Sequence, residues 1–213
     1  MTKKELAARI LVFFIGIFIL SFGIVLIIKA NLGAASWDVL NIGLFKTFGL
    51  TIGSWSQLVG LVIVIVSFFI YRHVISFGTV LNMLFIGWFI DLFMYILPEI
   101  NHLLIQILVL LLGILITGLG VGIYIAANVG TGPRDSLMMA LSIKYGWNVA
   151  TVKTIMELSA ILVGWLLGGP VFIGTIIAAF MIGPIIKQTL KFSVKLVTPI
   201  FDRYKKQESS NKI

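Results

Sequence analysis

Long hydrophobic stretches alternate with short polar connections along this chain. A helix that crosses the hydrocarbon core of a bilayer needs about 20 mostly apolar residues, and six stretches come close to or reach this length. They cover residues 10–28, 55–71, 77–97, 103–127, 152–167 and 171–186. The pattern predicts an all-α polytopic membrane protein with six spans, in which the short second and fifth spans extend into their flanks.

Composition supports this interpretation and excludes other classes. Of 213 residues, 60% are hydrophobic and only 11% are charged, whereas a soluble domain is about half apolar and a quarter charged. The chain contains no cysteine. A secreted disulfide scaffold and a cysteine-ligated metal or iron–sulfur site are therefore excluded.

The basic residues define an orientation for the six spans. The net charge is +8, and fourteen of the sixteen Lys and Arg residues fall on one side, leaving Lys29 and Lys46 on the other. Lys and Arg accumulate in cytoplasmic connections, so we expect both termini in the cytoplasm. Because the basic residues flank apolar spans, we attribute the charge to membrane orientation and expect no nucleic-acid partner.

The two halves of the chain resemble each other at a spacing of 97 residues. Under this shift, Ala30-Asn31-Leu32-Gly33 aligns with Ala127-Asn128-Val129-Gly130, and Asp38 aligns with Asp135. After a one-residue deletion, Phe77-Gly78-Thr79 aligns with Ile173-Gly174-Thr175. An ancestral duplication accounts for this nearly gapless match.

Each half contains three spans, so the second half enters the membrane from the opposite side. We therefore predict two inverted-topology repeats, residues 10–97 and 103–190, within a single membrane domain, residues 1–213. This plan is common among secondary transporters. Residues 191–213 form a basic amphipathic or disordered cytoplasmic tail, and we expect this tail to bind anionic lipids of the inner leaflet.

The connections between the first and second span of each half, residues 31–53 and 128–150, carry most of the polar chemistry. Each begins Asn-x-Gly and continues into a helix of about three turns that ends at Gly49 or Gly146. Such helices are too short to span the bilayer, so they are re-entrant or interfacial. Their candidate substrate-binding residues are Asn31, Gly33, Ser36, Asp38, Asn128, Gly130, Thr131, Gly132 and Asp135.

Two interpretations of these connections remain open. In the first, Ser36 caps one helix, Pro133 begins the other, and Asp38 and Asp135 only oppose the positive ends of the helix dipoles. In the second, both helix N-termini converge on a ligand site near the membrane midplane. The dipoles favour an anionic ligand, but the two carboxylates fit a cation, a zwitterion or a proton about as well.

Two further acidic residues are ion-coupling candidates because ionisable groups inside spans are often functional. Glu157 follows Lys153 by one helical turn, and the alternative is an interfacial ion pair between them. Asp91 lies near the outer end of the third span, where it either reaches the headgroups or has a buried role. Separately, Gly16, Gly23, Gly113 and Gly120 predict close packing of the first spans of the two halves.

No enzyme motif is present: the chain has no Walker A loop, no G-x-S-x-G and no H-E-x-x-H. We therefore expect no catalytic activity and no cofactor. The two histidines, His73 and His102, fall on opposite sides of the membrane in this topology, so we expect no metal site. The sequence leaves the oligomeric state open, including a homodimer.

The segments Ala30–Asp38 and Asn128–Asp135 resemble those of the YczE/YitT-like bacterial membrane proteins, and the likeness covers nearly all of the membrane region. It is closer to the YczE side, because YitT proteins carry an additional soluble C-terminal domain. The resemblance implies a bacterial plasma-membrane protein and leaves its biochemistry open.

The inverted repeat and the paired short helices favour a small secondary transporter or permease for a small polar solute, with its site at the repeat interface. A non-transporting scaffold, regulatory or assembly protein is the alternative. A further alternative is a substrate-binding membrane subunit that needs an ATPase partner.

Overall fold

The computed structural model describes residues 3–210 and the side chains of residues 4–202. Within this range the chain is helical, with no strand. The elements in chain order are α1 (Lys3–Lys29), α2 (Ser36–Phe48), α3 (Ile52–Tyr71), a 3-10 turn η1 (Arg72–Val74), α4 (Phe77–Ile96), α5 (Leu103–Ala126), α6 (Pro133–Tyr145), α7 (Val149–Leu166) and α8 (Ile173–Ser210).

Six of these helices are long and apolar enough to cross a membrane: α1, α3, α4, α5, α7 and α8. This confirms the six predicted spans, and the two short ones do extend into their flanks, since α3 begins at Ile52 and α7 at Val149. The helices α2 and α6 have 13 residues each. At 1.5 Å per residue they are about 20 Å long, well short of about 30 Å of hydrocarbon.

The ends of α2 and α6 follow the predicted signals, with one correction. Gly132 caps α6, Pro133 is its first residue, and Gly146 ends it in a left-handed conformation. Ser36 was expected to cap α2, but it is the first helical residue, and Ala35 occupies the cap position without a side-chain bond. The serine lies one position too late to accept from the free N–H groups of the first turn.

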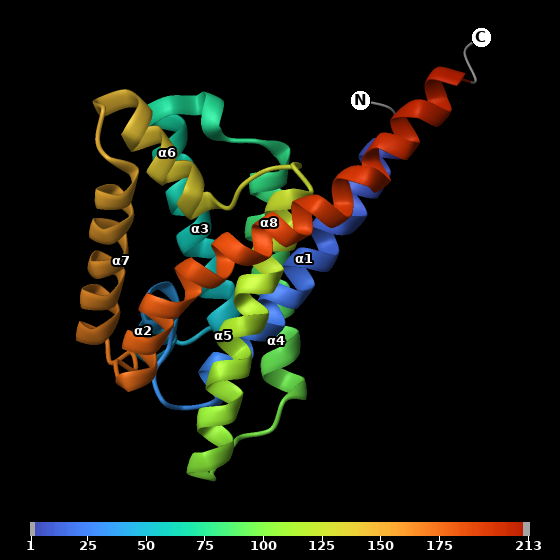
Figure 1. Ribbon diagram of the computed structural model, residues 1–213. Coiled ribbons are helices and arrows are strands. Elements are labelled where there is room, and N and C mark those ends of the chain that lie inside the picture. Colours follow the sequence, from blue (N-terminus) through green and yellow to red (C-terminus); the bar gives the residue numbers. More distant parts are fainter. Residues whose placement is uncertain (1–2, 211–213) are drawn as a thin grey trace.

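The first spans of the two halves, α1 and α5, cross in close contact at the centre of the molecule (Figure 1). A Cβ atom added at Gly16 would lie 2.4 Å from the backbone nitrogen of Tyr124, and one at Gly113 would lie 2.9 Å from that of Ile27. Gly16 and Gly113 are equivalent in the 97-residue repeat, as are Ile27 and Tyr124. The predicted glycine-mediated packing is thus confirmed, and each contact has a counterpart in the other half.

Each short helix packs on a span from the other half of the chain. The helix α2 contacts α7, and α6 contacts α3. The buried backbone at Gly43 of α2 meets Gly164 of α7, where an added Cβ would lie 2.5 Å from a carbonyl oxygen. The two halves are therefore interleaved, and their short helices lie toward opposite ends of the molecule (Figure 1).

The helix α8 is longer than the sequence predicts. We predicted a basic amphipathic or disordered tail from residue 191; the described part of this stretch is helical, and it continues α8 without a break through Ser210, with Pro184 and Pro199 inside the helix. Residues 211–213 of the predicted tail lie outside the described residues. The α8 end beyond Lys191 runs beside the N-terminal end of α1, and both chain ends lie at the same end of the molecule (Figure 1).

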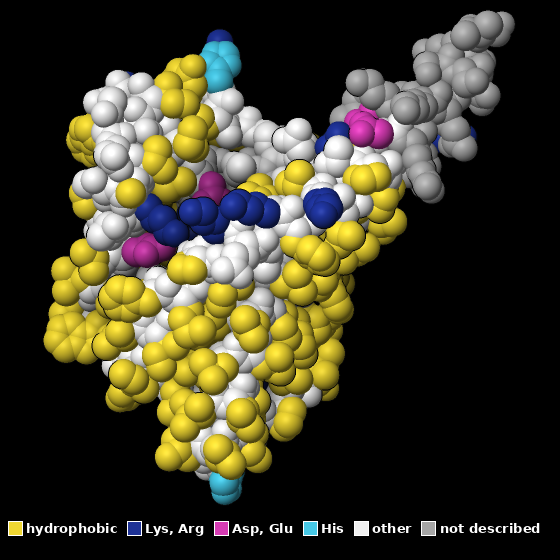
Figure 2. Space-filling view, viewed as in Figure 1, with side chains coloured by type: hydrophobic (Ala, Val, Ile, Leu, Met, Phe, Trp, Pro, Cys, Tyr) yellow, Lys and Arg dark blue, Asp and Glu magenta, His cyan; other side chains and the backbone are white. Residues whose placement is uncertain are grey.

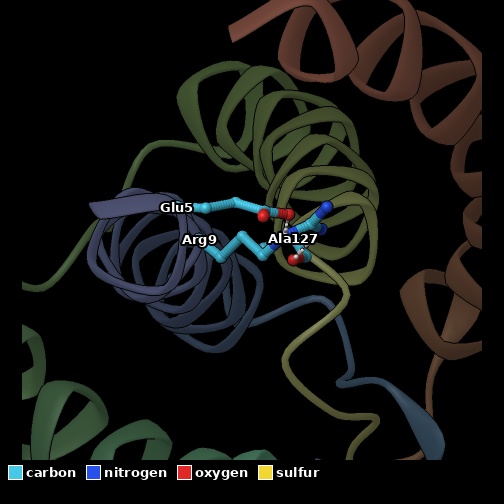
Figure 3. Close-up of polar contacts among 3 residues, drawn as sticks. All are labelled: Glu5, Arg9 and Ala127. Carbon is cyan, nitrogen blue, oxygen red and sulfur yellow. Dashed lines mark hydrogen bonds and ion pairs between the residues drawn. The ribbon is translucent and has the colours of Figure 1, made fainter. Parts of the chain in front are cut away.

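Arg9 connects the N-terminal end of α1 to the C-terminal part of α8. Its guanidinium lies 4.2 Å from the centre of the Phe201 ring of α8. Figure 3 shows the other contacts: Nη1 donates to the carbonyl oxygen of Ala127 at 3.0 Å, and Nε pairs with Glu5 Oε1 at 3.0 Å. One side chain of α1 thus holds both the end of α5 and the extended part of α8.

Candidate functional site

A cavity of about 330 Å³ lies where the N-terminal turns of α2 and α6 meet. Its floor and walls are apolar side chains of α1, α4, α5 and α8, including Leu20, Ile24, Met83, Val121 and Ile182. The face seen in Figure 2 is largely hydrophobic, and a row of basic side chains crosses its middle with acidic side chains beside it.

The cavity lining repeats itself across the two halves. Most lining positions of the first half recur in the second at the spacing of 97 or 96 residues. The pairs include Leu20 with Thr117, Ile24 with Val121, Trp37 with Arg134, Asp38 with Asp135, Ser56 with Lys153, Gly60 with Glu157, Asn82 with Ala178 and Met83 with Ala179. Equivalent residues therefore face one another across a common space.

Two charged residues in the first turn of α6, Arg134 and Asp135, contact residues of α2 and α5. The Tyr124 hydroxyl donates to Asp135 Oδ2 at 3.3 Å, and the Arg134 guanidinium lies 4.8 Å from the centre of the Trp37 ring. Burial raises the pKa of Asp135, while the bond from Tyr124 and the charge of Arg134 oppose that rise. A carboxylate and a guanidinium thus enter the cavity on consecutive residues.

Asp38, in the first turn of α2, is the least satisfied of these charged groups. Its side chain is buried, at 3% exposure, and Oδ1 has no hydrogen-bond partner among the described residues. Burial raises the pKa of Asp38 to about 6, against the lowering effect of Arg134. An ionised carboxylate in this position carries a desolvation cost that the charge of Arg134 offsets only in part.

The cavity also holds an ion pair on α7. Lys153 Nζ lies 3.8 Å from Glu157 Oε1, one helical turn away, and both residues line the cavity. The predicted pairing of these residues is therefore present, and it faces the cavity. Together with the first turns of α2 and α6, the lining carries three carboxylates and two basic groups.

Five of the eleven predicted site residues line this cavity: Ser36, Asp38, Gly132, Asp135 and Glu157. The others lie outside it. Asn31 and Asn128 both adopt a left-handed backbone, with φ of 54°, and turn the chain after α1 and α5. Their matching conformations are a further likeness between the two halves.

Among the remaining predicted residues of the connections, Gly33 and Gly130 pack against helix starts in the opposite half, whereas Thr131 contacts α6 of its own half. Gly33 abuts Thr175 at the start of α8, and Gly130 abuts Ser76, which caps α4. The Thr131 hydroxyl lies 3.4 Å from that of Ser136. These positions anchor the short helices, and the absence of a Cβ at Gly33 and Gly130 permits that close approach.

Asp91 lies at the far end of α4, outside the cavity. Its Oδ2 accepts from the Thr51 hydroxyl at 2.6 Å, and its Oδ1 accepts from the Gly53 backbone N–H at 2.8 Å. Both oxygens hold the start of α3. A role for Asp91 in ion coupling stays a prediction.

Comparison with known proteins shows the family of this chain. Residues 7–191 match a family of unknown function, DUF6198. The chain is 42% identical over 196 residues to the uncharacterized membrane protein YczE of Bacillus subtilis (strain 168), a match that covers 92% of this chain and 91% of that protein. The chain belongs to this YczE-like family. The predicted resemblance is thereby confirmed, and the chain is a multi-pass membrane protein.

Two other relatives extend the family. An uncharacterized protein of Haemophilus influenzae (strain ATCC 51907 / DSM 11121 / KW20 / Rd) is 32% identical over 178 residues, covering 84% of this chain and 81% of that protein. The uncharacterized protein YyaS of B. subtilis (strain 168) is 28% identical over 172 residues, with 79% and 86% covered. No solved structure matches this chain.

Several cavity residues of this YczE-like protein escaped the sequence reasoning. Arg134 contributed only to the distribution of basic residues, Lys153 only to that distribution and to the pairing with Glu157, and Asn82 and Thr117 were not predicted as site residues. The repeat itself held a signal, because Trp37 and Arg134 are equivalent positions of the two short helices. A basic residue in the first turn of a helix is also unfavourable, because it lies at the positive end of the helix dipole. This marks Arg134 as unusual.

The two sides of the cavity differ in how closely their helices pack. The helix α3 packs along α4, whereas the equivalent pair, α7 and α8, lacks such packing over the described residues. An added Cβ at Gly87 of α4 would lie 2.4 Å from the Gly53 carbonyl oxygen, but one at the equivalent Gly183 of α8 meets no atom within 4 Å. The cavity is thus closed between α3 and α4 and open between α7 and α8.

Proposed function

We propose that this protein is a small secondary transporter or permease for a small polar solute, with its site in the cavity between two inverted repeats. The observation that carries the proposal is the meeting of two short helices, one from each half, whose first turns bring Asp38, Arg134 and Asp135 into one cavity. Broken or short helices that point their N-termini at a central site are a recurrent device of secondary transporters.

The mirrored contacts support the inverted arrangement. Gly16 against Tyr124 has its counterpart in Gly113 against Ile27, and α2 on α7 has its counterpart in α6 on α3. A two-fold axis in the membrane plane would relate such contacts. Three spans per half would then place α2 at the outer side and α6 at the cytoplasmic side, with both termini in the cytoplasm as the distribution of Lys and Arg favours.

The unequal packing of the two halves supports alternating access. The pair α3 and α4 is closed, and the pair α7 and α8 is open. If the halves exchange these arrangements, the cavity closes between α7 and α8 and opens between α3 and α4. In an inverted repeat, this exchange would move the entrance to the opposite side of the membrane.

Thiol labelling tests the topology, because the chain has no cysteine of its own. Phe48 and Tyr145 are equivalent, exposed residues at the far ends of α2 and α6, at 62% and 52% exposure. We expect a membrane-impermeant maleimide to label Phe48→Cys only from outside and Tyr145→Cys only from inside. Labelling of both from one side would contradict the inverted repeat.

Flux measurements test the function. The purified protein is reconstituted in proteoliposomes, and uptake of a panel of polar solutes is followed with and without a proton or sodium gradient. We expect uptake of at least one solute, abolished in Asp38→Asn and preserved in Asp202→Asn, which removes an exposed carboxylate outside the cavity. No uptake across the panel would favour the scaffold or regulatory alternative.

A further inference from the structure

The polar groups that remain unpartnered in the cavity specify the kind of solute it takes. Resting on the proposed function, we propose that the cavity binds a small organic cation that joins an ammonium group to an apolar body. Asp38 would accept the ammonium group, and the walls of α1, α4 and α5 would hold the apolar body. The site is assigned from charge, unmet hydrogen bonding and the chemistry of the walls.

One carboxylate oxygen of the cavity, Asp38 Oδ1, has no hydrogen bond within the described residues, and the charge of Arg134 only partly offsets the burial of that carboxylate. Lys153 pairs with Glu157, and Asp135 accepts the Tyr124 hydroxyl. Arg134 stacks on Trp37, where cation–π attraction holds its guanidinium. Asp38 Oδ1 is left without a hydrogen bond, and a cation at this position would relieve the cost of burying it.

Two further polar atoms point to the neutral part of the ligand. Asn82 Nδ2 and Thr117 Oγ1 line the cavity in residues only 2% and 6% exposed, and neither has a hydrogen-bond partner within the described part of the chain. A Cβ atom added at Gly132 would lie 3.2 Å from Asn82 Oδ1, so this amide sits beside the start of α6. An acceptor on the ligand would satisfy the amide, since buried donors need partners.

The rest of the cavity suits an apolar body. Leu20, Ile24, Met83, Ile86 and Val121 line it, and a volume of about 330 Å³ is that of a small-ligand pocket. The opening lies between α7 and α8, where a Cβ atom added at Gly183 would meet no described atom within 4 Å. A purely hydrophilic ion would leave these apolar walls unused.

An anion is the competing ligand, because two helix N-termini lie at the cavity. Asp38 and Asp135 already oppose those positive ends, and the two basic groups are engaged as described above. With every group ionised, three carboxylates outnumber two basic side chains in the lining. The charged group with an unmet hydrogen bond within the described residues is a carboxylate, and the carboxylates are in excess, which favours a cation.

Four matched probes test this proposal: 2-phenylethylamine (cation), 2-phenylethanol (neutral), 3-phenylpropionate (anion) and phenylalanine (zwitterion). Each is titrated calorimetrically into the full-length protein in zwitterionic nanodiscs at pH 7.5, with empty nanodiscs subtracted. We expect the amine to bind at least about 10-fold more tightly than the other three, the gain of one desolvated ion pair.

The variant series separates charge from fold. Asp38→Asn should weaken amine binding at least about 10-fold and leave 2-phenylethanol unchanged. Asp38→Glu should recover most of the affinity, and Asp202→Asn should bind like the unaltered protein. A loss of 2-phenylethanol binding in Asp38→Asn would mean that this variant has a damaged cavity. The amine affinity of Asp38→Glu then tests the proposal: recovered affinity supports it, and lost amine affinity with unchanged 2-phenylethanol binding overturns it.

The outcomes distinguish the ligand class from the transport proposal. Tighter binding of 3-phenylpropionate, phenylalanine or 2-phenylethanol than of the amine overturns the cation assignment while the cavity remains a solute site. Failure of all four probes, with flux of a solute that lacks an ammonium group, also overturns the assignment alone. Failure of all four probes and no flux across the solute panel overturns both proposals.

Discussion

The pairs α3–α4 and α7–α8 occupy equivalent positions in the two halves of the chain and yet are built differently. Gly60 of α3 lies so close to α4 that an added Cβ would be 2.8 Å from Met83 Cγ. At the equivalent positions of α7 and α8, Glu157 and Ala179 face an open cavity. The same framework therefore exists in a closed and an open arrangement within one molecule.

The difference follows from where the charges lie. Ser56 and Gly60 on α3 are small and neutral, so α4 packs directly on them. Their equivalents on α7 are Lys153 and Glu157. Closing α8 over this pair would desolvate two charges, which is costly unless further hydrogen bonds compensate. The charged pair on α7, which has no counterpart on α3, would therefore oppose closure of the second half.

A reversible disulfide between α3 and α4 should give the largest effect on this comparison. Cysteines at Gly60 and Met83 replace residues whose Cβ positions lie 3.7 Å apart, within the range for a disulfide. We expect rapid oxidation of this pair, loss of all flux, and recovery of flux with a reductant. The equivalent pair, Glu157→Cys with Ala179→Cys, should oxidise far more slowly. Equal oxidation rates would contradict the asymmetry.

Neutralising the two equivalent aspartates gives the next largest effect. Burial raises the pKa of Asp38 from 3.8 to about 6. Ionisation of Asp38 therefore lowers the free energy of unfolding, and this loss grows as pH rises from about 4 to 6 and is constant above. Asp38→Asn should raise the free energy of unfolding by up to about 3 kcal/mol at pH 7.5 and by nothing below pH 4. Asp135→Asn should gain less, because Tyr124 already bonds that carboxylate. Thermal unfolding at both pH values measures this, and destabilisation by Asp38→Asn at pH 7.5 would contradict it.

Valine at the two equivalent glycines should separate folding from transport. Gly87→Val forces a side chain against Gly53 and should cost about 1–3 kcal/mol of stability. Gly183→Val meets open space, so stability should stay within about 0.5 kcal/mol while flux falls because α7 cannot close. Thermal midpoints and proteoliposome uptake test the pair together. Equal losses of stability in both variants would show that the two sites are packed alike.

The contact between Trp37 and Arg134 should have the smallest effect. The two residues are equivalent in the repeat and stack across the cavity at 4.8 Å. A double-mutant cycle with Trp37→Leu and Arg134→Gln should give a coupling energy of about 1 kcal/mol. Additive single effects would mean that the ring and the guanidinium do not interact.

Much of the fold is present in the sequence because its signals are local. Hydropathy gives the six spans, Pro133 and Gly146 mark the ends of α6, and the seven-residue spacing of Gly16 and Gly23 predicts the α1–α5 contact. Each depends on a residue's own backbone or on its place along one helix. The position of Ser36 was off by one residue, since helix starts depend on the preceding turn.

The cavity was harder to predict because its chemistry depends on contacts across the whole chain. The repeat singled out Asp38 and Asp135, which both line the cavity, but Arg134 and Lys153 look like ordinary cytoplasmic charges in the sequence. Only the interleaving of α2 with α7 and α6 with α3 brings them together. The open pair α7–α8 was likewise invisible, because helices with similar hydropathy can pack or stand apart.

The continuous helix α8 joins the cavity wall, which it lines as far as Ile186, to the tail beyond residue 191. From Gly183 to Asp202 the helix extends about 28 Å, with Pro184 at its base and Phe201 resting on Arg9 at its far end. If α8 tilts about Gly183 like a lever, a tilt of about 10° moves that far end by about 5 Å over such a length. A small tilt of α8 at the cavity would thus move the far end of this helix by a larger distance, and the contact between Arg9 and Phe201 would restrain that movement.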